Sequence, residues 1–368
     1  MNQSDLFKII TNHKGKNLPF VVFNEPYSDE IHAKLQIDDI LHTECDLSSG
    51  AFVFAPFDSK KFNKIYMPFD KCKSYKSLSS NKVIRSNFDS KNSDDILNKK
   101  THIKLIKKSL TAIKNGVLKK VVLSRTELMS ISSVDLALVF KKLLSFYNNS
   151  YVYLWFHPKV GFWVGATPEK LLTIEDNFIE TVALAGTTKK GPDGSVSWSV
   201  KEIKEQQYVK SYILDSLINI VDNLSSAKTI NIQSGNLYHL CSTISGSLKS
   251  FNDYNSVIKL IHPTPAVCGI PLDVSKEFIS LNESYDRSYY TGYLGIISPK
   301  KKSVKLYVNL RCAEVFDSFI KIYVGGGITK ESNPANEFDE TIAKSHIMKN
   351  VFIKKLIFLI HIFAFYLI

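Results

Sequence analysis

The segment from Gly325 to Lys344 gathers residue types that suit binding of a metal ion together with an anionic substrate. A run of three glycines, Gly325–Gly327, ends an apolar, strand-like stretch, and Glu337, Glu340 and Lys344 follow it. Glycine admits backbone conformations that turn several N–H groups towards one anion. Glu337 and Glu340 are three residues apart, so both carboxylates lie on one face of a helix. This segment predicts part of an active site.

A second pair of glutamates, Glu202 and Glu205, repeats that spacing in a stretch whose periodicity predicts a helix over about 199–224. Two helices that each offer a Glu-x-x-Glu pair can hold one hard divalent cation, some carboxylates binding directly and others through water. Mg²⁺ keeps several waters in such sites, which leaves room for a substrate carboxylate. Either pair alone is more simply a solvated helix face.

Two residues at strand ends could transfer protons. Lys120 begins the run Lys-Val-Val-Leu-Ser-Arg, and burial in a cleft beside other cations would favour the neutral amine that a base requires. Glu169 follows Pro168 at a bend between two expected strands, where desolvation would keep its carboxyl protonated, as a general acid requires. The plain alternatives are a surface lysine and a solvated turn glutamate.

Two further features would shape a pocket for an anion. Arg311, at the end of another expected strand, could hold a carboxylate through two parallel hydrogen bonds. The stretch His262–Gly269 contains two prolines, which fix φ and remove two N–H donors. It therefore predicts a rigid, non-helical loop that can form one wall.

The elements expected to position these residues alternate between helices and strands. Residues 1–95 contain short apolar runs split by polar turns, which predict a strand-rich part of the same fold. Residues 96–349 form the expected catalytic region, in an order typical of an α+β fold with mostly antiparallel sheets and helices outside. The other expected helices lie near 101–115, 133–147 and 254–261, and the expected strands near 120–124, 151–157, 161–166, 170–174, 293–297, 303–311 and 318–324.

Composition and the two ends of the chain limit the partners. The formal net charge of +12 comes from scattered lysines without interleaved aromatic residues, so we expect no nucleic-acid partner. Residues 1–6 lack a signal-peptide pattern, and the expected location is the cytoplasm. An apolar tail fills most of residues 350–368, but the thirteen residues from Leu356 give about 20 Å of helix, less than the roughly 30 Å of a bilayer core. We expect the tail to dock on the body, with a weak membrane-surface contact as the alternative.

Taken together and in order, several segments resemble the chorismate-utilising enzyme family. They lie at residues 120–125, 165–172, 181–187, 201–209, 239–240, 262–269, 285–295, 309–313 and 325–344. The resemblance implies a single large fold with antiparallel sheets as its core and helices outside. It also implies a Mg²⁺-dependent site in a deep cleft.

The resemblance further implies a role for each candidate residue. Lys120 matches the base that activates water for attack at C2 of chorismate, and Glu169 the acid that protonates the departing C4 hydroxyl, which gives isochorismate. The implied metal ligands are Glu205 and Glu340, with Glu202 and Glu337 linked through water. The implied substrate contacts are Gly186, Thr187, His239, Arg311, Gly325, Gly326, Gly327 and Lys344.

Members of this family differ in nucleophile and product. Aminodeoxychorismate synthases that use an enzyme amine as nucleophile carry Pro-Ile-Lys-Gly-Thr where this chain has Leu184–Thr187. Here Ala185 has no amine that could attack the substrate ring. Water is therefore the favoured nucleophile. The His-Pro-Thr-Pro-Ala loop resembles isochorismate-forming members rather than anthranilate synthases. The resemblance thus implies an isomerase for menaquinone or siderophore biosynthesis, with a salicylate-forming enzyme or a non-catalytic membrane-peripheral relative as alternatives. Independently of the resemblance, we expect a monomer.

Overall fold

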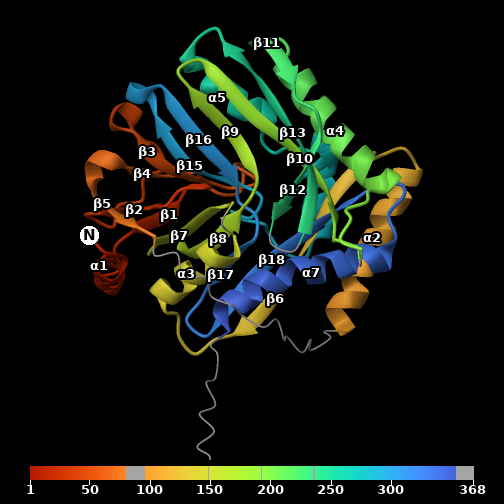
Figure 1. The fold of residues 1–368 in the computed structure, drawn as a ribbon. Coiled ribbons are helices and arrows are strands. Elements are labelled where there is room, and N and C mark those ends of the chain that lie inside the picture. The colour runs from red at the N-terminus through yellow and green to blue at the C-terminus, as the bar shows by residue number, and fades with distance from the viewer. Residues whose placement is uncertain (80–95, 148, 192, 235–236, 354–368) are drawn as a thin grey trace, which may run out of the picture.

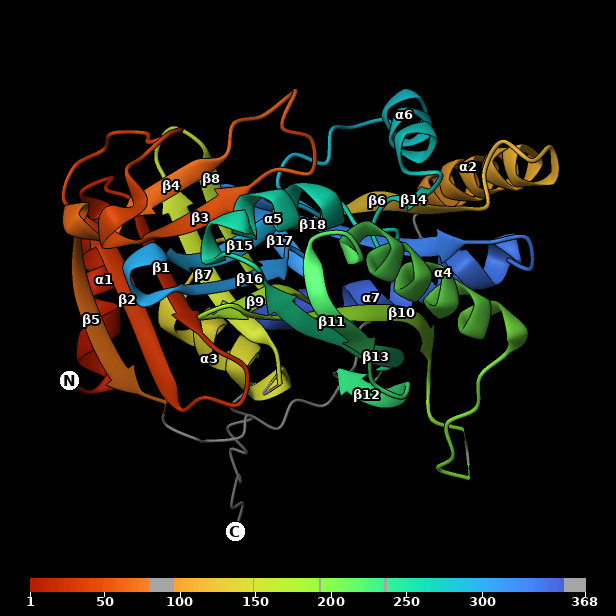
Figure 2. The same ribbon diagram turned by 90° about the horizontal axis from the view of Figure 1, so that it is seen from above.

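Two large antiparallel β-sheets pack face to face in the computed structural model, with helices on their outer faces (Figures 1 and 2). The structure describes residues 1–79, 96–147, 149–191, 193–234 and 237–353. Every strand pair within these ranges is antiparallel, as a chain of hairpins and returning strands requires.

The first sheet has the strand order β14-β6-β18-β17-β8-β7-β1-β2-β5. Along this order the strands are β14 (Gly269–Ile270), β6 (Lys120–Ser130), β18 (Phe319–Ile328), β17 (Cys312–Val315), β8 (Gly161–Thr167), β7 (Tyr151–His157), β1 (Phe20–Asn24), β2 (Glu30–Gln36) and β5 (Cys72–Leu78). The pairing of β6 with β18 sets Val122 opposite Gly327, so the run that begins at Lys120 lies beside the glycine segment.

The second sheet has the order β11-β13-β10-β9-β16-β15-β3-β4, and β12 also pairs with β13. These strands are β11 (Val221–Ser226), β13 (Leu237–Leu248), β10 (Phe178–Thr188), β9 (Lys170–Glu175), β16 (Ser303–Val308), β15 (Tyr293–Ser298), β3 (Ala51–Ala55), β4 (Ile65–Pro68) and β12 (Ile230–Ser234). Strands from the first 79 residues thus lie in both sheets, where β1 pairs with β7 and β3 pairs with β15 (Figure 1).

The interior strands have apolar residues on both faces because both faces are covered. Every residue of β7 is buried. Tyr151, Tyr153 and Trp155 point between the sheets into an aromatic core, whereas Val152 and Leu154 point outward into a second core under the helices. This alternation explains why β7 reads as a continuous apolar run.

Helices cover the outer faces. Leu6 of α1, Phe140 of α3 and Met348 of α7 pack on the first sheet, and Val209 of α4 and Val257 of α5 pack on the second. The helices are α1 (Gln3–Gly15), α2 (Ile96–Lys114), α3 (Leu136–Phe146), α4 (Val200–Leu217), α5 (Tyr254–Ile261), α6 (Leu272–Asn282) and α7 (Pro334–Phe352), and 3-10 turns lie at Leu47–Ser49, Phe69–Lys71, Phe251–Asp253 and Pro299–Lys301. Of these, α4 and α7 carry the two Glu-x-x-Glu pairs.

The α+β class with antiparallel sheets and outer helices is confirmed. The expected helix over 199–224 was too long: it ends at Leu217 and β11 begins at Val221, because Asn223 has a φ of 53°, which a right-handed helix does not allow. The expected strand over 303–311 was also too long. β16 ends at Val308, and Arg311, with a φ of 47°, turns the chain into β17.

Two helices were not predicted. α1 lies in the part expected to hold only strands, where Asn2 caps its first turn by accepting the Asp5 N–H and Leu6 and Ile10 supply a short apolar stripe. α6 follows Pro271 and has two buried residues, Ser275 and Ile279, so its periodic signal is weak. None of the helices within the described ranges is both long and apolar enough to cross a membrane. Residues 354–368, most of the apolar tail, lie outside those ranges.

Candidate active site

A pocket of about 760 Å³, including its open mouth, is lined by both sheets and by α4 and α7. Most of the candidate residues line it: Glu169, Gly186, Thr187, Glu205, His239, Arg311, Gly325, Gly326, Gly327, Glu340 and Lys344. Lys120, Glu202 and Glu337 are not part of the lining. The structure therefore brings residues from seven separate stretches of chain into one cavity.

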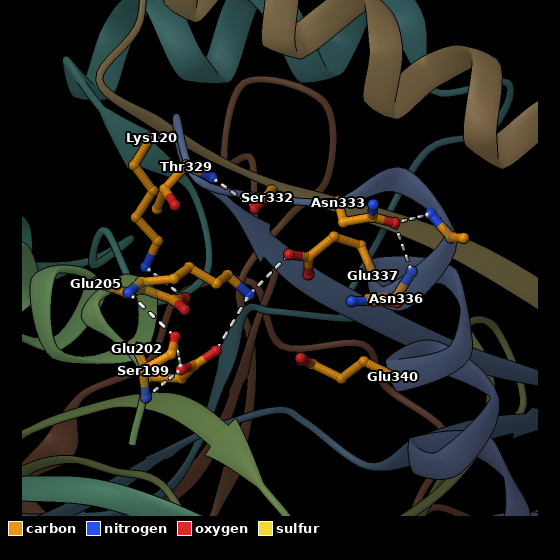
Figure 3. Close-up of polar contacts among 12 residues, drawn as sticks. Lys120, Ser199, Glu202, Glu205, Thr329, Ser332, Asn333, Asn336, Glu337 and Glu340 are labelled. Carbon is orange, nitrogen blue, oxygen red and sulfur yellow. Dashed lines mark hydrogen bonds and ion pairs between the residues drawn. The ribbon is translucent and has the colours of Figure 1, made fainter. Parts of the chain in front are cut away.

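The glycine segment of β18 is the surface on which the glutamates converge. A Cβ at Gly327 would lie only 2.0 Å from Glu205 Oε1, so the carboxylate from α4 rests directly on the backbone. At Gly326, an added Cβ would lie 3.7 Å from Glu340 Oε1 and 3.8 Å from Glu337 Oε2 of α7. Carboxylates from two helices, α4 and α7, thus approach two adjacent glycines of β18. Figure 3 shows Glu205 on α4 and Glu337 and Glu340 on α7.

Each of three glutamates faces a lysine. Lys120 Nζ lies 3.1 Å from Glu205 Oε1, and Lys344 Nζ lies 2.7 Å from Glu340 Oε1. The third lysine was not predicted from sequence: Lys201 Nζ lies 2.8 Å from Glu337 Oε1. The only signal for it was its place beside Glu202 at the start of the helix. Because of these pairs, the glutamates form a network of alternating charges.

Lys120 is fully buried behind Gly327. The sequence led us to expect a lysine that lines the cleft beside other cations. The structure corrects both points, because the contacting charge is the Glu205 carboxylate (Figure 3) and Lys120 is not among the residues that line the pocket. Lys120 is still close to the cavity, because it lies against Glu205 and Gly327, and both of these residues line the cavity.

Glu169 is a buried carboxyl group in the pocket wall. Its backbone is held at the bend between β8 and β9, where its N–H donates to Thr167 Oγ1 at 3.3 Å and its carbonyl accepts the Val308 N–H at 2.9 Å. Burial raises the pKa of Glu169 to about 8, although Lys120, Lys344 and Arg311 act to lower it. The group is thus largely protonated at neutral pH, as predicted from its place at the bend.

His239 and Arg311 form a linked pair in the pocket lining. Burial and then the charge of Arg311 lower the pKa of His239 to about 3, so the imidazole is neutral. Its Nε2 lies 2.8 Å from Arg311 Nη2, which can only donate, and its Nδ1 lies 2.9 Å from the Gly186 carbonyl, which can only accept. The proton of His239 is therefore on Nδ1, and the ring orients the guanidinium group in the pocket.

The other candidates occupy the rim. Lys344 donates to the Gly325 carbonyl at 3.0 Å as well as pairing with Glu340. Glu202 Oε2 accepts the Ser199 N–H at 3.0 Å and completes a capping box at the start of α4. One carboxylate oxygen of Glu202 therefore caps the start of α4 (Figure 3).

A buried ion pair that sequence reasoning missed braces the pocket from behind. Arg287 pairs with Glu283 at 2.6 Å, and its guanidinium donates to the carbonyls of Val267 and Val122 at 2.8 and 2.7 Å. Val267 belongs to the proline-containing loop, which lines the pocket as expected. Because Arg287 binds two backbone segments at once, it fixes that loop against β6.

The donor set suits a hard divalent cation. Carboxylate oxygens are the ligands that Mg²⁺ takes from proteins. Glu337 Oε2 is buried and has no hydrogen-bond partner among the described residues, and burial raises the pKa of Glu337 to about 7 although Lys201 lowers it. Within those same residues, no three His, Cys, Asp or Glu side chains form a ready metal-binding group. The lysines described above separate the carboxylates.

Comparisons with known proteins agree with this geometry. The chain is 28% identical over 257 residues to isochorismate synthase MenF of Haemophilus influenzae, which covers 67% of the chain and 59% of that relative. It is 27% identical over 268 residues to anthranilate synthase component 1 of Saccharolobus solfataricus, covering 70% of the chain and 63% of the relative. These alignments span less than two thirds of each relative's length.

Solved structures share the fold. DhbC of Bacillus anthracis superposes with a TM-score of 0.76 at 24% identity, over 90% of this chain and 96% of that one. MenF of Escherichia coli gives a TM-score of 0.75 at 21% identity, over 91% and 89% of the two chains. A family profile described as "Chorismate binding enzyme" matches residues 50–353. Since this match spans most of the chain and contains every candidate site residue, the protein belongs to the chorismate-binding enzyme family.

Proposed function

We propose that this protein is a Mg²⁺-dependent isochorismate synthase, an isomerase that converts chorismate to isochorismate. The observation that carries the proposal is that Glu169, a carboxyl with a pKa of about 8, shares one cavity with two cations suited to carboxylates, Arg311 and Lys344. A buried acid is what departure of a hydroxyl group needs, and the cations match an anionic substrate.

Substrate binding would use charges already fixed in the pocket. Chorismate is a dicarboxylate, so it presents two anionic groups at opposite ends. Arg311, oriented by His239, offers a planar set of donors to one carboxylate. Lys344 and the backbone of the glycine segment offer a second positive region on the other side of the cavity.

The proposed reaction needs one base and one acid. In the proposed mechanism, Lys120 takes a proton from a water molecule whose oxygen bonds to C2 of the ring. Both ring double bonds shift, from C1=C2 and C5=C6 to C1=C6 and C4=C5, the C4–O bond breaks, and the hydroxyl leaves as water with the proton of Glu169. One water is added and one is lost, so the reaction is an isomerisation. Ala185, which lines the pocket, has no amine that could replace water as the nucleophile.

A magnesium ion would be held by Glu205 and Glu340, with Glu202 and Glu337 acting through water. When bound, it would neutralise the ring carboxylate of chorismate. The protein's own contribution is to place these oxygens over Gly326 and Gly327, where no side chain blocks a substrate. We further propose that the protein acts as a cytoplasmic monomer in menaquinone or siderophore biosynthesis. The solved structures of MenF of Escherichia coli and DhbC of Bacillus anthracis are described as menaquinone-specific and 2,3-dihydroxybenzoate-specific isochorismate synthases.

The rate should depend on pH through Glu169. Its pKa is raised to about 8, so the acid form required for proton donation predominates below that pH and is lost above it. We expect kcat/KM to fall about tenfold per pH unit above roughly pH 8, because kcat/KM reports the ionisation of the free enzyme. Initial rates at saturating Mg²⁺ check this. A kcat/KM that stays constant from about pH 7 to 10 would contradict the role of Glu169.

The deciding experiment is to incubate the purified protein with chorismate and Mg²⁺, with and without EDTA, and to separate the products by chromatography. We expect isochorismate only when Mg²⁺ is free, because a bound cation is needed to neutralise the substrate carboxylate. Salicylate together with pyruvate would instead show that the same scaffold eliminates pyruvate. If chorismate stays unchanged although the protein is folded and has metal bound, the proposed enzymatic activity is contradicted.

A further inference from the structure

Lys201 is the charged group of the site that the proposed reaction does not use. It lies in the first turn of α4, and its side chain is only 12% exposed. Besides Glu337 at 2.8 Å, it lies 3.9 Å from Glu202 Oε1, and the charges of Glu205 and Glu340 also act on it. One ammonium group therefore balances carboxylates that come from two helices.

The glutamates around Lys201 are the same four that the proposed function assigns to a divalent cation. Two cations cannot both sit in contact with one buried carboxylate pair without strong mutual repulsion, since burial reduces solvent screening. Lys201 also leaves the site incompletely satisfied, because Glu337 Oε2 has no hydrogen-bond partner among the described residues. The glutamates around Lys201 therefore include one buried carboxylate oxygen, Glu337 Oε2, that the lysine does not bind.

We propose that Lys201 is an internal counter-cation that holds the site of the divalent cation in the metal-free protein and is displaced from Glu337 when the metal binds. This inference rests on the proposed function, since it requires a cation at these glutamates. Lysine suits the exchange because its ammonium group is a point charge on a flexible four-carbon stem. The part of the side chain that is already exposed gives it a direction in which to leave.

The exchange has two consequences. Without metal, Lys201 keeps α4 and α7 together, because the buried carboxylates of the two helices would otherwise repel one another. With metal, the cost of moving Lys201 weakens the apparent affinity. Metal binding and the position of one side chain are thus coupled, and removal of that side chain should strengthen metal binding.

Calorimetric titration of the full-length protein with Mn²⁺ or Mg²⁺ alone tests this coupling. We expect Lys201→Gln to bind the metal at least about tenfold more tightly than the unmodified protein, and its melting temperature in EDTA to be lower. Lys201→Arg keeps a cation and should bind weakly. The matched control is Lys204→Gln, which removes an exposed lysine of the same helix that pairs with Glu331 outside the site. Equal or weaker binding by Lys201→Gln would overturn the inference.

A second measurement needs no variant and so does not depend on how Lys201→Gln folds. Lysines of the unmodified protein are acetylated briefly with and without Mg²⁺, and each modified position is quantified by mass spectrometry. We expect labelling of Lys201 to rise severalfold with Mg²⁺ while that of Lys204 stays constant. Labelling of Lys201 that is unchanged or reduced by Mg²⁺ would show that the lysine stays in place.

These results separate the inference from the proposed function. If isochorismate forms with Mg²⁺ but neither affinity nor labelling changes as expected, the inference fails and the function stands. If Mg²⁺ binds and Lys201 is released but no isochorismate forms, the proposed function fails and the counter-cation is supported. If no metal binds to either protein, the inference is overturned.

Discussion

Replacement of Lys120 by alanine should lower kcat for isochorismate formation by about 10²–10⁴-fold, the range that a positioned general base contributes. The lysine is fully buried beside Glu205 and is the amine that the proposed mechanism uses to take a proton from water. Steady-state rates at saturating chorismate and Mg²⁺ measure the loss.

The neighbouring residue supplies the control for this variant. Lys119 precedes Lys120 in the chain but is exposed, so Lys119→Ala removes the same charge from the surface. It should leave kcat within about twofold. Circular dichroism and a Mg²⁺ titration of Lys120→Ala separate lost catalysis from lost folding or lost metal binding. A Lys120→Ala protein that keeps more than a tenth of the original kcat would exclude the lysine as the base.

Replacement of Gly327 by alanine should abolish metal-dependent activity while leaving the fold intact. The new Cβ would lie 2.0 Å from Glu205 Oε1, a distance that real Cβ atoms do not adopt, so the carboxylate must move. Glu205 is the proposed metal ligand from α4, and its displacement should weaken Mg²⁺ binding by about 10–100-fold, similar to other losses of ligand orientation. Calorimetry with Mg²⁺ and the isochorismate assay measure both effects.

The adjacent glycine offers a matched comparison. At Gly326 an added Cβ would make ordinary contacts of 3.7 and 3.8 Å with Glu340 and Glu337, so those carboxylates can stay where they are. The fold-change in Mg²⁺ affinity caused by Gly326→Ala should therefore be less than about a tenth of the fold-change caused by Gly327→Ala. Equal losses in the two variants would mean that backbone flexibility, and not the space beside Glu205, is what the glycines provide.

Sequence patterns located most of this site because its chemistry is carried by local spacings. The two Glu-x-x-Glu pairs need only helical periodicity to place both carboxylates on one face, and α4 and α7 do form there. The bend at Glu169 and the glycine segment also depend on neighbouring residues in the chain. The α+β class followed from the same periodicities.

The features of the site that could not be predicted from the sequence depend on contacts between segments far apart in the chain. The position of Lys201 follows from a side-chain contact between α4 and Glu337 of α7, and nothing in its neighbourhood along the chain marks it as part of the site. The same holds for Arg287, whose guanidinium joins the loop at Val267 to β6. Lys120 was expected beside cations and lies beside a carboxylate, because its surroundings are set by a helix far along the chain.

The pairing of β6 with β18 also determines when the site can form during synthesis. Its register joins Val121 to Ile328, so one wall of the pocket needs residues from the first and last thirds of the chain. Until β18 leaves the ribosome, β6 lacks this partner and exposes unpaired backbone groups that can join another chain. Pairings between such distant segments are also slow to form. A nascent chain can therefore complete this wall of the pocket only after β18 has left the ribosome.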